Sequence, residues 1–164
     1  MGLFSWLFGS KTGKRRAPSV WRPSLPSGKF GQDRHKPEGK WVQTTTTLKV
    51  AGVRHRQDAV HDFMRAVARA QGGSTRYGVN LRPDPTNAHD KNAIAVDGYA
   101  GSDRWHIGFL DRDTAAELHR DLISNGIRID AELYSLWRGD DGYVDVNVIV
   151  LAPPGHSMKK RLNA

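Results

Sequence analysis

Two segments in the C-terminal half of the sequence constrain the fold most, because apolar residues recur in them at every second position. These positions are Ile127, Ile129, Ala131 and Leu133 in residues 127–137, and Val144, Val146, Val148 and Val150 in residues 143–151. A period of two is typical of β-strands that bury one face. The intervening residues 138–142 read RGDDG, a composition that favours a tight turn. The sequence therefore predicts a long antiparallel hairpin.

The region before this hairpin predicts four further strands and two helices. Stretches of β-branched and apolar residues predict strands at residues 41–52, 75–81, 92–96 and 104–110. Helical spacing of apolar residues predicts helices at residues 58–71 and 112–124, the second with Asp111 as its N-cap. No repeated strand–helix–strand series of the doubly wound kind is present. We therefore predict a mainly β fold with two helices (α+β), built as a small OB-like, partly closed six-stranded barrel.

Most of the formal net charge of +8 lies outside this predicted domain. Residues 1–40 contain nine Lys and Arg against two acidic residues, and residues 159–161 add three basic ones, which leaves residues 41–158 slightly acidic. Any binding of phosphates by the domain must therefore depend on a local patch rather than on bulk charge. We predict a disordered basic N-terminal arm (residues 1–40), one domain (41–153) and a basic C-terminal tail (154–164).

The apolar residues 3–8 are too few for a signal peptide or a membrane span. Trp6 also stands where a myristoylation signal requires Ser or Thr. A frayed terminus is the simplest interpretation of this segment, and docking in a partner's groove or contact with a membrane surface are the alternatives. The chain has no cysteine, which excludes disulfides, thiol catalysis and cysteine-based zinc sites. We expect a cytoplasmic protein.

The most specific motif lies in residues 81–96. Its members are Pro85, Asn87, Asp90, Asn92 and Ala93, which fill the pattern P-x-N-x-x-D-x-N-A. Gly108 and Leu110 follow in a strand of the form V/I-G-aromatic-L, and residues 50–59 open with V-x-G. This order of motifs, over about residues 46–150, resembles the HIRAN domain family.

The resemblance implies a non-catalytic DNA-binding module without cofactors. Its expected ligand is single-stranded DNA, notably the free 3′ end of a strand, in repair or other DNA processing. HIRAN modules occur attached to helicase-like ATPases and nucleases, which are the expected protein partners, and also alone in short bacterial proteins. A free 3′ end offers a hydroxyl for a carboxylate, bases for stacking and phosphates for cations.

The resemblance places six residues at the DNA: Arg54, His55, Asn87, His89, Asp90 and Arg112. Asp90 falls on the position that meets the terminal 3′-hydroxyl, with Asn87 beside it, and Arg54 falls on a phosphate contact. His55 and His89 stand where DNA-binding members have tyrosines that stack on bases. A histidine ring can stack and can bind phosphate, but it is smaller and titrates near neutrality. Phe109 stands where a polar contact residue can occur.

Other interpretations of these residues remain open. Asn87 and Asp90 equally suit a loop in which their side chains bond nearby backbone amides, and Arg54 and Arg112 could simply be solvated. Trp105 and Trp137 fit the faces of strands, in core or edge packing.

Two rival functions also follow from the sequence. A metal nuclease is the first, because Asp84, Asp90 and Asp97 lie close together, but no D/E-x-K strand accompanies them and we predict neither a metal site nor an enzyme. The second is a protein-interaction or adaptor module that has lost DNA-end binding through the change of tyrosine to histidine.

Overall fold

The computed structural model describes residues 25–31 and 36–162 of the chain. Its strands are β1 (Gly28–Phe30), β2 (Val42–Lys49), β3 (Tyr77–Pro83), β4 (Ile94–Ala100), β5 (Asp103–Phe109), β6 (Asp130–Arg138) and β7 (Val144–Ala152). Its helices are α1 (Gln57–Ala70), α2 (Arg112–Asp121) and α3 (Met158–Leu162), with short 3₁₀ turns η1 (Val53–Arg56) and η2 (Ile123–Asn125). The predicted sequence segments fall within a few residues of β2 to β7, α1 and α2.

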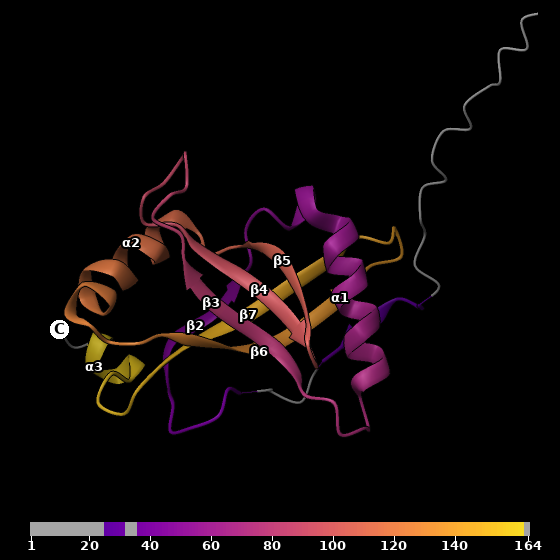
Figure 1. Ribbon diagram of the computed structural model, residues 1–164, viewed down its shortest axis with the longest axis horizontal. Coiled ribbons are helices and arrows are strands. Elements are labelled where there is room, and N and C mark those ends of the chain that lie inside the picture. The colour runs from indigo at the N-terminus through magenta and orange to yellow at the C-terminus, as the bar shows by residue number, and fades with distance from the viewer. Residues whose placement is uncertain (1–24, 32–35, 163–164) are drawn as a thin grey trace, which may run out of the picture.

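The strands form two antiparallel sheets, in the orders β1-β6-β7-β2 and β3-β4-β5. In Figure 1 the three-stranded sheet lies in front of the four-stranded one. The sheets join where β2 and β5 end, because Ala51 N donates to Phe109 O at 2.8 Å and Phe109 N donates to Ala51 O at 2.9 Å. The mainly β, α+β, OB-like fold is confirmed. The details differ, since the described residues form seven strands and three α-helices, and the sheets do not close into a barrel.

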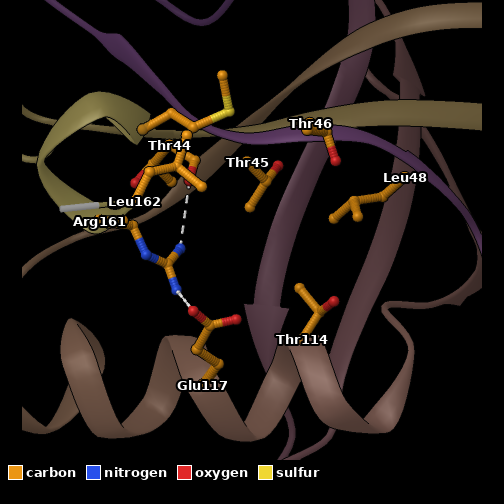
Figure 2. Close-up of a pocket in the computed structure, with 9 residues that line it drawn as sticks. Thr44, Thr45, Thr46, Leu48, Thr114, Glu117, Arg161 and Leu162 are labelled. Carbon is orange, nitrogen blue, oxygen red and sulfur yellow. Dashed lines mark hydrogen bonds and ion pairs between the residues drawn. The ribbon is translucent and has the colours of Figure 1, made fainter. Parts of the chain in front are cut away.

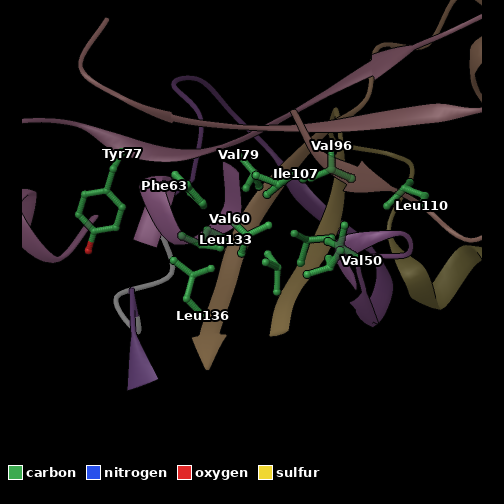
Figure 3. Packing of buried hydrophobic residues seen from close by; sticks show 14 of the residues in the cluster. Val50, Val60, Phe63, Tyr77, Val79, Val96, Ile107, Leu110, Leu133 and Leu136 are labelled. Atoms are coloured by element: carbon green, nitrogen blue, oxygen red, sulfur yellow. The ribbon is translucent and has the colours of Figure 1, made fainter. Parts of the chain in front are cut away.

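Apolar side chains from both sheets and α1 fill the space between the layers (Figure 3). The four valines that the alternation predicted on one face of β7, Val144, Val146, Val148 and Val150, are fully buried, and Ile149 and Leu151 on the other face are buried as well. Burying one such side chain contributes roughly 1.5–3 kcal/mol relative to leaving it exposed. Phe63 of α1 packs on Trp105 of β5, with ring centroids 5.8 Å apart.

The alternation in β6 changes phase part-way along the strand. Leu133 is buried as expected, but the register with β7 shifts between Leu133 and Ser135, so that Leu136 is the next buried residue. A bulge of this kind inserts one residue and reverses which positions face inward. Trp137 consequently lies on the outer face, where it is 45% exposed and not part of the core.

Part of the predicted disordered arm is an ordered strand. In β1, Gly28, Lys29 and Phe30 pair with Arg138, Trp137 and Leu136 of β6, and Phe30 packs against the core. A three-residue strand has almost no pattern of its own, because its order depends on the partner strand. The predictions for residues 3–8 lie outside the described residues.

The predicted C-terminal tail is also partly ordered, because α3 docks on β2 and α2. Arg161 pairs with Glu117 and Asp121 of α2, and its Nη1 donates to Thr44 O at 3.3 Å. Figure 2 shows Arg161 reaching Glu117 beside a cleft of about 200 Å³ between these elements. The Arg161 side chain is only 16% exposed, so this basic residue stabilises the domain and is not a free tail charge.

Arg161→Ala is expected to lower the free energy of unfolding by about 1–2 kcal/mol, because it removes hydrogen bonds that involve charged groups. Chemical denaturation checks this value. Lys160→Ala is the matched control, since Lys160 is an exposed neighbour, and it should change stability by less than about 0.5 kcal/mol. Equal effects of the two substitutions would contradict the docking of α3 through Arg161.

A second link between the sheets joins Asn80 of β3 to Asp130 of β6. Asn80 Nδ2 lies 3.4 Å from both carboxylate oxygens of Asp130, and Asp130 Oδ1 accepts from Ala131 N at 2.8 Å. Burial of this carboxyl raises its pKa above the usual value, and the hydrogen bonds only partly oppose that effect.

Asp130→Asn should therefore stabilise the protein near neutral pH and have little effect at low pH. A raised pKa in the folded state means that the folded protein holds its proton more tightly than the unfolded chain. The wild type then loses stability as the pH rises from about 3.9 through the raised pKa of Asp130. Urea unfolding of both proteins at about pH 3.5 and about pH 7 measures the difference. A gain that is the same at both pH values would contradict this assignment.

Candidate nucleic-acid interface

The loop of residues 84–93 joins β3 to β4 and projects above α2 in Figure 1. Two turns form it, because Asn87 N donates to Asp84 O at 3.1 Å and Ala93 N donates to Asp90 O at 3.0 Å. Asn87 Oδ1 accepts from the backbone N–H groups of His89 and Asp90, at 3.0 and 3.2 Å. Asn87 therefore shapes the loop, and the His89 side chain is left exposed near its tip.

Asp90 both shapes this loop and faces a cation. Its Oδ1 accepts from Asn92 N at 2.9 Å, while Oδ2 lies 3.9 Å from Arg112 Nε. Arg112 is the first residue of α2, and its Nη2 donates to His89 O at 3.4 Å. The Asp90 side chain is 20% exposed and that of Arg112 is 73% exposed. A carboxylate oxygen and a guanidinium thus stand side by side within reach of a ligand.

The N-terminus of α2 is fixed by its cap, which holds Arg112 in place. Asp111 Oδ1 accepts from Thr114 N at 3.0 Å, as the sequence predicted. One residue earlier, Leu110 N donates to Ile94 O at 3.0 Å, at the start of β4. Arg112 and the loop are therefore connected through backbone hydrogen bonds to the end of the three-stranded sheet.

The other two predicted residues, Arg54 and His55, are exposed in η1, which follows β2. The third basic residue of this turn, Arg56, has its guanidinium over the Phe109 ring, 5.1 Å from the ring centroid. A 3₁₀ helix has three residues per turn, so successive side chains point in different directions. Arg56 therefore contacts Phe109 at the end of β5, while Arg54 and His55 are exposed.

Phe109 lies between the two groups of residues. Its backbone pairs with Ala95 of β4 on one side and with Ala51, just before η1, on the other. The structure thus joins Asn87, His89, Asp90 and Arg112 in one cluster of contacts and places Arg54 and His55 beyond Phe109, at the same end of the sheet. We call this end of the fold the loop–η1 surface.

Arg56 and His106 also lie at this surface, although the sequence did not predict either of them there. His106 packs edge-on to Phe109, with centroids 4.8 Å apart, and its Nδ1 lies 3.0 Å from Asp97 Oδ1. Asp97 also accepts from Arg82 Nε at 2.8 Å, and this hydrogen bond raises the pKa of the guanidinium. The R-H-R run in η1 was the available signal for Arg56. His106 had no such signal, because Asp97, to which its ring bonds, lies in the neighbouring strand β4.

Comparison with known proteins gives one family. The family model described as the HIRAN domain matches residues 45–139, more than half of the chain. The chain belongs to the HIRAN domain family. HIRAN domains are DNA-binding modules, so DNA is the kind of partner that the family supports. The match covers the loop–η1 surface and ends before β7 and α3.

Two solved structures are similar to this chain at low identity. A crystal structure of a protein from Lactobacillus plantarum shares 20% identity, with a TM-score of 0.46, over 68% of this chain and 94% of that one. The crystal structure of the HIRAN domain of human HLTF shares 18% identity, with a TM-score of 0.41, over 75% of this chain and 93% of that one. No curated protein sequence matches this chain significantly.

Within residues 25–31 and 36–162, no group of three His, Asp or Glu side chains is placed to hold a metal ion. None of the helices in the same part of the chain is long and apolar enough to cross a bilayer.

Proposed function

We propose that this HIRAN protein is a non-catalytic module that binds single-stranded DNA at a free 3′ end through its loop–η1 surface. The observation that supports this most is the pairing of Asp90 Oδ2 with Arg112 beside the exposed His89. A carboxylate repels the phosphates along a strand and is useful only where the backbone ends in a hydroxyl donor. Arg112 then binds the preceding phosphate and neutralises Asp90.

The remaining residues of the surface supply the other contacts that a single strand needs. His89 and His55 offer exposed rings on which bases can stack, and Arg54 offers a second cation for phosphate. Asn87 contributes by holding the loop, because its side-chain oxygen is already bonded to two backbone amides. Proteins that process DNA, such as a helicase-like ATPase or a nuclease, are the partners that such a module would serve.

Binding of the full chain to three fluorescent strands of one sequence tests this function: one with a free 3′-hydroxyl, one with a 3′-phosphate and one circular. We expect the free 3′-hydroxyl to bind about tenfold or more tightly than the other two, the value of one hydrogen bond to a charged group. Equal binding of all three would reduce the interaction to non-specific charge. No binding at all would favour the protein-interaction module.

Arg54→Ala should weaken binding of all three strands by a similar factor, about fivefold at low salt, because phosphates are common to every strand. The slope of log affinity against log salt should fall by about 0.7, the contribution of one phosphate contact on a single strand. Titrations at several salt concentrations measure both quantities. Arg69→Ala is the control, since Arg69 is also exposed but lies at the C-terminal end of α1, away from η1. An unchanged salt slope for Arg54→Ala would argue against the phosphate contact.

A further inference from the structure

We propose that the outer face of β1 and β6, centred on Trp137, is a second contact site for the same single strand, several nucleotides from its 3′ end. The idea rests on the proposed function and extends it from the end of the strand to its path. Trp137 is 45% exposed, although the alternation of β6 predicted it in core or edge packing. An exposed indole on a sheet face is a platform on which a base of any identity can stack.

The cross-strand neighbours of Trp137 give this face its charge. Lys29 of β1 pairs directly with Trp137, so their side chains lie on the same face with Cβ atoms about 5 Å apart. On the other side Trp137 pairs with Asp145 of β7, and Lys49 of β2 neutralises that carboxylate through an ion pair of 2.9 Å. Lys29 is exposed, and no acidic residue is paired with it in the described contacts.

Two exposed cations lie on this face, Lys29 and Lys49, and the carboxylate among these neighbours, Asp145, is paired with Lys49. The net charge of Lys29, Lys49 and Asp145 is positive, which suits the phosphates of a nucleic-acid strand. The charge of this face therefore favours a single strand as its occupant.

The Trp137 face is continuous with the loop–η1 surface. Lys49 is the last residue of β2, and the chain reaches Arg54 of η1 five residues later. Gln57 at the start of α1 ties η1 to the four-stranded sheet, since its side chain bonds to both N and O of Val144 at the start of β7. Trp137 lies two strands from β2, a lateral distance of about 10 Å. A strand that leaves η1 can thus pass Lys49 and reach Trp137.

The test compares a short strand of about four nucleotides with one of about twelve, both with a free 3′-hydroxyl. For the full-length chain, Trp137→Ala should weaken the long strand about tenfold and the short strand by less than about twofold. Trp137→Phe should retain most of the affinity because it retains a ring. Lys29→Ala should weaken the long strand several-fold, and Lys160→Ala should not.

Three results would overturn the inference. The first is that Trp137→Ala leaves the affinity for long strands, linear or circular, unchanged. The second is that Trp137→Ala weakens short and long strands equally, because this would indicate an effect on the 3′-end site. A change of the oligomeric state on Trp137→Ala would assign the face to a second copy of the chain. Asp90→Ala separates the two proposals, since it should reduce end preference at both lengths and leave the length-dependent contribution of Trp137 intact. A thermal melt of each variant confirms that the fold is retained.

Discussion

Replacing Gly108 by alanine should lower the free energy of unfolding by about 3 kcal/mol, the largest effect on stability that we expect from one added methyl group. A Cβ at this position would lie 2.6 Å from Val50 Cγ1 and closer still to the carbonyl oxygen of Ala51. That oxygen accepts the hydrogen bond from Phe109 N that joins the two sheets. Because backbone atoms cannot move aside as a side chain can, the junction between the two sheets, where Ala51 pairs with Phe109, must open.

Gly73→Ala is the matched control for this substitution. A Cβ at Gly73 would lie 3.5 Å from its nearest neighbour, the Ala70 carbonyl oxygen, which is an ordinary contact. Its stability should stay within about 0.5 kcal/mol of the wild type. Urea denaturation measures both variants. If Gly108→Ala were as stable as Gly73→Ala, the close approach of residues 50–51 to β5 would be wrong. Since the junction also places η1 beside the loop, Gly108→Ala should lose DNA affinity as well.

The largest expected effect on binding is the loss of end preference in Asp90→Ala. Without the carboxylate, a terminal hydroxyl loses its acceptor and a terminal phosphate is no longer repelled. The preference for a free 3′-hydroxyl over a 3′-phosphate should therefore fall by about tenfold or more, to near equality. Affinity for a circular strand should change little, because Asp90 has no favourable contact there. Competition binding with the two linear strands measures the ratio directly.

Asp90→Asn separates this role from the role of Asp90 in the loop. An asparagine oxygen can still accept from Asn92 N, so the loop should keep its conformation, while the negative charge near Arg112 is lost. We expect Asp90→Asn to bind strands with a 3′-phosphate more tightly than the wild type does. If Asp90→Asn kept the full wild-type preference, Asp90 would be a structural residue of the loop only.

The sequence by itself determined the features that depend on neighbouring residues. The period of two in β7 predicted its buried valines, and helical spacing predicted α1, with Phe63 on its buried face. Asp111 caps α2 as predicted, and the motif of residues 85–93 folds into a loop held by its own Asx side chains. Hydrogen bonds over two to four residues and side-chain periodicity are local properties, so they can be predicted from the sequence without knowledge of the fold.

The tertiary structure decided the features whose partners are distant in the sequence. The bulge after Leu133 placed Trp137 on the outer face of the sheet. The segment β1 is a strand only because β6 has a free edge for it to pair with. Arg161 docks on α2 and is not a free charge of the tail. The same holds for the site, since the meeting of Ala51 with Phe109 is what places η1 near the loop. A hydrogen bond between two strands, or an ion pair, stabilises the fold only when both of its partners are in place. One segment alone therefore contains no signal for it, and only packing of the two sheets fixed which residues meet.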